Sequence, residues 1–369
     1  MKRILLIIVA AIALYSCNSA PSYTIKGTVN KTDLEGAQVF LTLTENRETT
    51  NIDTATITNG AFELKGVVET PKIYAISINN NDEDPIRVSF ILENAPITIT
   101  IDENENKIGG TPTNDAFQQY QSQIAVFNKQ IEDVYEEYKT SNEAGEMTPE
   151  LEESLSAKLD EAYEKMLELQ KQFAAANINN PAGQTVLRSV SYRLSAEELR
   201  TAISGADSTA TQTDILKGIS ERIDALEKTA VGQKYTDLRY PNPDGIEVAL
   251  SDYVEKNKVV LVDFWASWCG PCRRDMPNVV AAYKKYKNKG FEVVGVSLDR
   301  TKEAWVKGIE ELNITWPQMS DIKYWDSEAA KTYAVNSIPH MMLIDAEGTI
   351  IARGIHGGDL DSMLNDLLK

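Results

Sequence analysis

The chain is constrained most by the segment CGPC at residues 269–272, which places two thiols about one helical turn apart. Before it, residues 259–262 form a short β-branched and apolar run, which predicts a buried strand. After it, residues 271–286 carry apolar side chains at helical spacing, so the pair is expected at a helix N-terminus. Unpaired backbone N–H groups there stabilise a thiolate, and the pKa of Cys269 should fall below the value of about 8.5 for a free thiol. The pattern predicts a redox site.

The two cysteines and a nearby carboxylate are assigned separate steps. Cys269 is predicted to be the nucleophile, and Cys272, expected to lie deeper, resolves the mixed disulfide that Cys269 forms with a substrate. Pro271 is tolerated in the first helical turn, and the spacing lets the pair close a disulfide with little strain. Asp263 lies on the preceding strand among Val, Leu, Phe and Trp, where desolvation would raise its pKa. We expect Asp263 to exchange a proton with Cys272; a solvated strand end is the alternative.

The segment VDFWASWCGPC at residues 262–272 resembles the active-site segment of thioredoxins, and its flanks resemble the TlpA/ResA-like envelope branch of that family. The resemblance covers residues 231–369 and recurs in VNSIPH at residues 335–340. It implies an α/β thioredoxin-like fold and thiol:disulfide oxidoreductase activity, with Pro339 cis and facing the cysteines. An ordinary trans proline opening an edge strand is the alternative. The resemblance further implies substrate-binding positions at Trp268, Gly270, Pro271 and Ile338, the last through its backbone.

Two acidic positions bear on how closely the chain follows this branch. Many members carry Asn at the position of Asp263, so the buried acid resembles that of general thioredoxins. Asp275, three residues after Cys272, matches an acidic position of ResA-like reductases. It is either a second proton-handling carboxylate or a favourable partner of the helix dipole, and both interpretations stay open. His340 and His356 are the only histidines, so we expect no metal site and no cofactor beyond the cysteine pair.

The first 17 residues predict export. Lys2 and Arg3 precede an apolar stretch, residues 4–14, that is too short to span a bilayer of about 30 Å. The residues LYSC at 14–17 resemble a lipoprotein signal, which implies lipidation at Cys17 and a mature chain anchored to a membrane, facing the periplasm. An uncleaved anchor and a soluble secreted protein that has lost Cys17 are the alternatives. The net charge of −18 argues against nucleic acid as a partner.

Residues 22–111 predict a small antiparallel β-sandwich, and they resemble an uncharacterised β domain found ahead of envelope thioredoxins. Asn59-Gly60 is typical of a hairpin turn. The expected strands are short and alternating, and they span residues 23–29, 37–43, 52–57, 62–67, 73–78, 86–92 and 97–101.

Residues 112–230 predict a helical region. Apolar side chains recur at three and four over residues 117–138, and a second stripe follows Thr148-Pro149, so the two helices should form an antiparallel hairpin. A partner helix or a dimer is the alternative use of these stripes. Ser195 and Glu198 predict a capping box, and residues 215–226 predict the last helix before the redox domain.

These features favour an envelope reductase of protein disulfides. The resemblance implies a membrane electron donor as the source of reducing equivalents and leaves the oligomeric state open. A disulfide-forming oxidant and a thiol peroxidase are alternative enzymes. A binding or scaffold lipoprotein, whose acidic front half does the work, is the alternative of another class.

Overall fold

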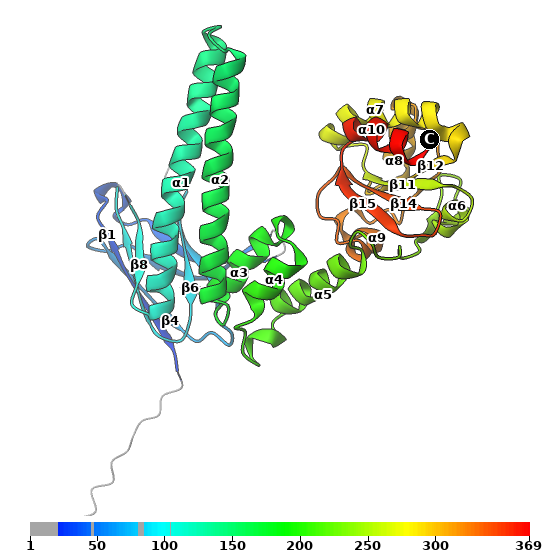
Figure 1. The fold of residues 1–369 in the computed structure, drawn as a ribbon. Helices are drawn as coiled ribbons and strands as arrows, with labels where there is room; N and C mark the ends of the chain where they lie inside the picture. The colour runs from blue at the N-terminus through cyan, green and yellow to red at the C-terminus, as the bar shows by residue number, and fades with distance from the viewer. Residues whose placement is uncertain (1–20, 46–47, 80–84, 104) are drawn as a thin grey trace, which may run out of the picture. The chain divides into compact units, whose positions relative to one another are not determined.

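The computed structural model describes residues 21–45, 48–79, 85–103 and 105–369, which Figure 1 shows in colour. The chain divides into two compact units: the first runs to Leu169 and includes Asn180–Gly183, and the second holds Gln170–Asn179 and Gln184–Lys369. The expected signal segment, with Cys17, lies outside the described residues. Within the described ranges, no helix combines the length and the apolar character that crossing a bilayer requires.

Two four-stranded sheets form the β part of the first unit. Buried and exposed side chains alternate along β1 and β4, so one face of their sheet is buried. All seven predicted strands are confirmed, and β8, only three residues long, was not predicted. The sheet of order β4-β1-β7-β8 contains β1 (Tyr23–Val29), β4 (Ala61–Gly66), β7 (Pro96–Ile101) and β8 (Lys107–Gly109); the sheet of order β3-β2-β5-β6 contains β2 (Gln38–Glu45), β3 (Glu48–Thr56), β5 (Lys72–Ile78) and β6 (Ile86–Leu92).

The topology corrects two predictions about these sheets. The purely antiparallel arrangement was wrong, because β1 and β7 pair in parallel. Asn59 and Gly60 do form a tight turn, with φ of 52° and 67° and a bridge from Thr58 to Ala61. The strands that this turn joins, β3 and β4, belong to different sheets. The turn therefore carries the chain from one sheet to the other.

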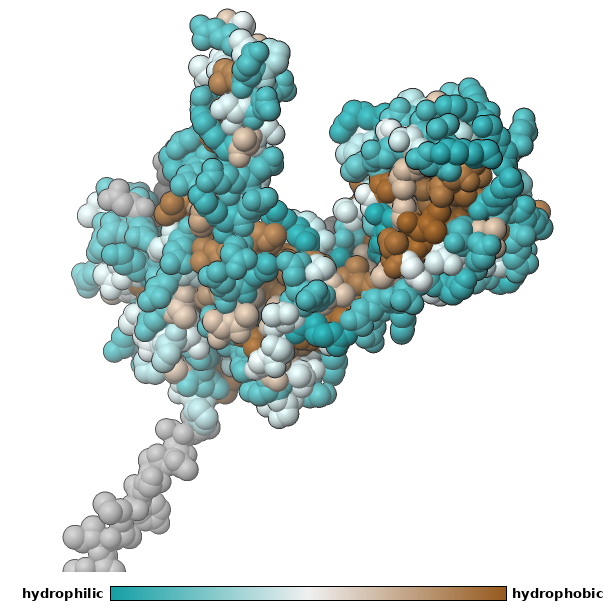
Figure 2. Space-filling model, viewed as in Figure 1, coloured by the Kyte–Doolittle hydropathy of each residue, from teal (hydrophilic) through white to brown (hydrophobic). Residues whose placement is uncertain are grey.

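Two long helices, α1 (Pro112–Glu143) and α2 (Pro149–Ala176), confirm the predicted antiparallel hairpin (Figure 1). The Thr148 hydroxyl accepts from the N–H of Leu151 at 3.2 Å and so caps α2. The hydroxyls of Tyr135 and Tyr163 lie 3.5 Å apart across the pair. Figure 2 shows mostly hydrophilic residues on the outer part of the hairpin.

Three shorter helices follow, α3 (Pro181–Val190), α4 (Ala196–Ile203) and α5 (Asp214–Lys228). The capping box of Ser195 and Glu198 is confirmed. Pro181 opens α3, since proline is accepted at the first helical position.

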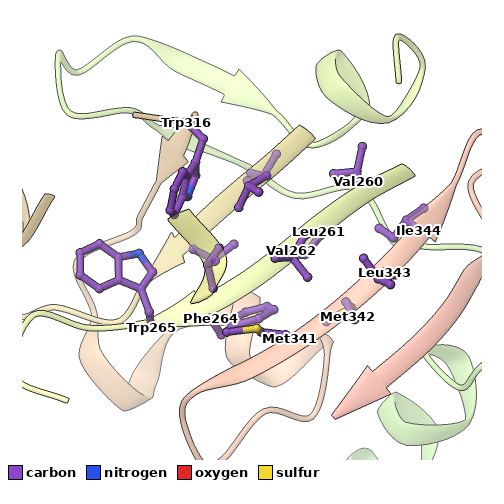
Figure 3. Close-up of a cluster of buried hydrophobic side chains, with 14 of the residues drawn as sticks. Val260, Leu261, Val262, Phe264, Trp265, Trp316, Met341, Met342, Leu343 and Ile344 are labelled. Carbon is purple, nitrogen blue, oxygen red and sulfur yellow. The ribbon is translucent and has the colours of Figure 1, made fainter. Parts of the chain in front are cut away.

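The redox domain is built on a five-stranded sheet of order β13-β12-β11-β14-β15, as the thioredoxin-like prediction requires. Every residue of β11 is buried, because this central strand is covered on both faces. Figure 3 shows its hydrophobic side chains beside those of β14, and Figure 2 shows hydrophobic residues at the level of the sheet, beneath the hydrophilic surface of α7 and α10. The strands of this sheet are β11 (Val259–Trp265), β12 (Phe291–Ser297), β13 (Gln318–Met319), β14 (His340–Asp345) and β15 (Ile350–Ile355). The helices of the domain are α6 (Ser251–Val254), α7 (Gly270–Tyr286), α8 (Lys302–Glu311), α9 (Glu328–Thr332) and α10 (Leu360–Leu367). A hairpin of β9 (Arg239–Pro241) and β10 (Glu247–Ala249) precedes them.

Candidate redox site

The paired cysteines lie where β11 ends and α7 begins. Cys269 and Cys272 are joined in a disulfide, with their Cα atoms 5.3 Å apart. Cys269 caps α7, and its sulfur accepts from the N–H of Cys272 at 3.1 Å. The exposed fractions are 4% for Cys269 and 2% for Cys272, so the first cysteine is the more accessible by a small margin. The next two residues, Gly270 and Pro271, are exposed at the rim.

The loop of residues 334–339, here called the proline loop, precedes β14. The pairing of β14 with β11 brings this loop to the cysteines. The Ile338–Pro339 peptide bond is cis, and the carbonyl oxygen of Ile338 lies 3.6 Å from the sulfur of Cys269. Phe264 near the end of β11 faces His340 at the start of β14 in an antiparallel register. This pairing brings together two segments that are about 70 residues apart in the sequence. The pairing therefore places a backbone carbonyl and the first sulfur of the pair side by side.

Asp263 lies on β11 and is buried, with an exposed fraction of 1%. Neither of its carboxylate oxygens has a hydrogen-bond partner among the described residues. Desolvation, with a smaller contribution from the negative charge of Asp275, raises the pKa of Asp263 to about 7. A carboxyl with this pKa can both take up and release a proton near neutral pH.

Asp275 on α7 is occupied by structural hydrogen bonds. It accepts from the N–H of Gly357 at 2.7 Å and from the side-chain amide of Asn278 at 3.0 Å. A Cβ atom at position 357 would lie 2.5 Å from a carboxylate oxygen of Asp275, so glycine is needed for this approach. Asp275 thus ties α7 to the turn before α10, and its charge contributes to the raised pKa of Asp263.

Trp268 forms part of a partly exposed aromatic cluster beside the cysteines. Its side chain is 45% exposed, and its ring centroid lies 5.1 Å from that of Tyr324 and 6.2 Å from that of Trp325. The guanidinium of Arg300 lies 3.9 Å from the Tyr324 ring centroid, at cation–π distance. Sequence reasoning selected only Trp268, because its partners lie far away in the chain and carry no motif.

Asp299 is a further residue of the site that sequence reasoning missed. It is fully buried, and its carboxylate accepts from the hydroxyl of Ser267 at 2.6 Å, the N–H of Ser267 at 3.1 Å and the hydroxyl of Ser297 at 2.8 Å. Ser267 belongs to the turn between β11 and Cys269. The carboxyl ends of the parallel strands β11 and β12 meet at one edge of the sheet, which is the signal that could have identified Asp299.

Replacing Asp299 with alanine is expected to lower the free energy of unfolding of the redox domain by about 3 kcal/mol, because one buried and two partly buried donors lose their carboxylate acceptor. All five tryptophans of the chain lie in residues 265–325, so tryptophan fluorescence during urea unfolding reports on this domain. Asp366→Ala, at an exposed ion pair, is the control and should change the stability by less than about 0.5 kcal/mol. A loss below about 1 kcal/mol in Asp299→Ala would show that the carboxylate does not support the turn.

The described residues contain no cluster of three or more His, Cys, Asp or Glu side chains arranged to hold a metal ion. The buried Nε2 of His340 has no hydrogen-bond partner within the described ranges, and burial lowers the pKa of His340 to about 4, with Arg353 and Arg222 contributing. The side chain is therefore neutral at physiological pH.

Comparison with known proteins identifies two regions of the chain. Residues 231–353 match the AhpC/TSA family, and residues 23–117 match a domain of unknown function, DUF4369. Thiol-disulfide oxidoreductase ResA of Bacillus thuringiensis subsp. konkukian (strain 97-27) is 32% identical over 143 residues, which are 39% of this chain and 79% of that protein. ResA of Oceanobacillus iheyensis is 36% identical over 127 residues, 34% of this chain and 64% of that protein.

Among solved structures, the thioredoxin domain of a thiol-disulfide oxidoreductase from Bacteroides vulgatus is 35% identical and covers 38% of this chain and 99% of its own, with a TM-score of 0.36. The ResA relatives are thiol-disulfide oxidoreductases, and the paired cysteines described above are what that chemistry needs. The chain belongs to the ResA-like, thioredoxin-fold family of thiol-disulfide oxidoreductases.

Proposed function

We propose that this enzyme reduces protein disulfides in the cell envelope, held to a membrane by a lipid on Cys17. Its clients are disulfide-containing envelope proteins, and its reducing equivalents come from a membrane electron donor. The observation that carries the proposal is the placement of the Cys269 sulfur at the start of α7, 3.6 Å from the Ile338 carbonyl beside cis Pro339.

The reaction passes two electrons from the protein dithiol to the client disulfide. The Cys269 thiolate attacks one client sulfur, the client S–S bond breaks, and the departing thiolate takes up a proton. The Cys272 thiol then gives its proton to Asp263 and attacks the sulfur of Cys269. A second client thiolate leaves, and the enzyme holds the Cys269–Cys272 disulfide. The membrane donor returns two electrons, and two protons restore the dithiol.

Client binding uses the two surfaces that flank the cysteines. The backbone of Ile338 pairs with an extended client segment next to its disulfide, as in β-strand addition. Trp268, with Tyr324 and Trp325, offers aromatic contact area at one side of the pair, and Gly270 leaves room for the client backbone. These contacts align the client sulfur with Cys269, and alignment of this kind accounts for much of the rate in exchange reactions.

The direction of electron flow is tested by the reduction potential of the cysteine pair. The purified chain is equilibrated with glutathione redox buffers, and its dithiol fraction is measured by alkylation and mass spectrometry. We expect a potential near the roughly −270 mV of thioredoxin, because the dipeptide between the cysteines is the same. The reduced chain should also reduce insulin.

A potential near −120 mV, together with no insulin reduction, would instead assign the enzyme to disulfide formation. Reduction of hydrogen peroxide faster than of insulin would favour the thiol peroxidase. Full biological activity in a Cys269→Ser variant would favour the scaffold lipoprotein.

A further inference from the structure

Arg222 of helix α5 contacts the proline loop from outside the part of the chain that matches the AhpC/TSA family. One terminal nitrogen of its guanidinium donates to the carbonyl of Ala334 at 2.8 Å. With the Asn336 side-chain amide assigned the orientation that suits its neighbours, its oxygen accepts from both terminal nitrogens, at 3.0 and 3.1 Å. The Nε–H donates to the carbonyl of Ser191 at 3.1 Å. The guanidinium thus joins two helical segments to the loop that ends at Pro339.

A second arginine holds the same loop at its beginning. Arg353 of β15 donates to the carbonyl of Tyr333, and it also donates to the carbonyl and the hydroxyl of Thr229, the residue that caps α5. The end of α5 and the start of the proline loop are therefore bound to one guanidinium. Together, Arg222 and Arg353 attach α5 to this part of the chain at three residues: 333, 334 and 336.

Arg222 and Arg353 are two partly buried cations. Desolvation lowers the pKa of Arg222, and it lowers the pKa of Arg353 to about 10, with the charge of Arg222 contributing. No carboxylate in the described part of the chain contributes to the pKa of either group. Partly buried charges without counter-ions oppose folding unless other groups satisfy them, and here backbone carbonyls and one amide do so. These hydrogen bonds fix the backbone.

The backbone that they hold is strained. Ala334 has a φ of 50°, in the left-handed region that L-residues rarely adopt. Such a residue persists only when surrounding contacts over-determine it, and it is common where a functional loop must keep one shape. Ile338, four residues later, carries the carbonyl that lies 3.6 Å from the sulfur of Cys269.

We propose that Arg222 is a positioning residue of the redox site: from α5, it holds the loop of residues 334–339 so that the Ile338 backbone is set to pair with a client beside Cys269. The working redox unit of this protein then begins at α5 and not at residue 231. This inference rests on the proposed reduction of protein disulfides, since it assigns a residue to client alignment.

The test uses the full chain and two substrates, insulin and a small aromatic disulfide that needs no backbone pairing. In Arg222→Met, we expect kcat/KM for insulin to fall about tenfold, mainly through KM, because a displacement of about 1 Å misaligns an extended client. The rate with the small disulfide should change less than about twofold, since it does not use the Ile338 backbone. Arg200→Met is the matched control: Arg200 pairs with Glu227 of the same α5 at an exposed site, and its loss should alter neither rate.

A double-mutant cycle with Asn336→Ala locates the effect. If Arg222 acts through this loop contact, the double variant should be no less active on insulin than the less active of the two single variants. Equal losses on both substrates would show a general structural role and overturn the proposal, as would unchanged insulin kinetics in Arg222→Met. If Arg222→Met does not fold, as judged by tryptophan fluorescence, Asn336→Ala is tested alone. Its loss of kcat/KM for insulin is then compared with its change in rate on the small disulfide, by the same criterion. A wild-type chain that fails to reduce insulin overturns the proposed function itself, which is a different outcome.

Discussion

Cys269→Ser is expected to abolish the reduction of insulin, lowering its rate by at least about 1000-fold, because a serine hydroxyl at neutral pH cannot replace a thiolate in exchange with a disulfide. The substitution exchanges one sulfur atom for an oxygen atom and changes no other group, so it should leave the fold intact. The rate is followed by the turbidity of the released insulin chains. Tryptophan fluorescence confirms that the variant is folded, since every tryptophan lies in the redox domain.

Cys272→Ala separates the two cysteines. The first attack by Cys269 remains possible, but no second thiol resolves the product, so a mixed disulfide between Cys269 and the client should accumulate. Gel electrophoresis without reductant detects this adduct, and mass spectrometry identifies the client. An adduct that also forms in Cys269→Ser, or no adduct in Cys272→Ala with an active wild type, would contradict the assignment of Cys269 as the nucleophile.

Asp263→Asn is expected to remove a large pH dependence of stability. The folded pKa of Asp263, about 7, lies above the unfolded value of about 3.9. The folded state therefore binds the extra proton: the stability is fully present below about pH 4 and falls as the pH rises through 7. Relative to the asparagine variant, the wild type should lose roughly 4 kcal/mol between pH 4 and 9. Urea unfolding across this range measures the difference.

Asp361→Asn is a control, because Asp361 contributes a pH dependence of stability opposite in sign to that of Asp263. The hydrogen bond from Lys285 lowers the pKa of Asp361, so wild-type stability from this exposed group rises with pH and is lost as the pH falls through its folded pKa. A wild-type curve parallel to that of Asp263→Asn from pH 4 to 9 would show that Asp263 has an ordinary pKa.

Asp263→Asn should also slow turnover. An asparagine cannot take the proton from Cys272, so resolution of the mixed disulfide at pH 7 should fall about 100-fold, while the first attack by Cys269 is preserved. Rapid acid quenching then finds the mixed disulfide enriched in Asp263→Asn. Equal slowing of both steps would instead point to a distorted site.

Local sequence patterns predicted the parts of this protein that depend on neighbours in the chain. The apolar run of β11 predicted a strand covered on both faces, and from that burial the desolvation of Asp263 followed directly. Helix signals were equally local: Thr148, Ser195 and Glu198 cap helices through contacts within three residues. The CGPC spacing is itself a local property, and so is the disulfide that it allows.

What the sequence by itself determined is therefore the element order, the redox pair and its buried acid, because periodicity and short spacing act within a few residues. Apart from the approach of Pro339 to the cysteines, which the family resemblance implied, only the tertiary structure decided which distant segments meet. The register of β11 with β14 sets the Ile338 carbonyl beside Cys269, the parallel edge of β11 and β12 places Asp299 under the cysteine turn, and α5 brings Arg222 to the proline loop. These contacts depend on strand register and on packing between elements many residues apart, and no local period encodes either.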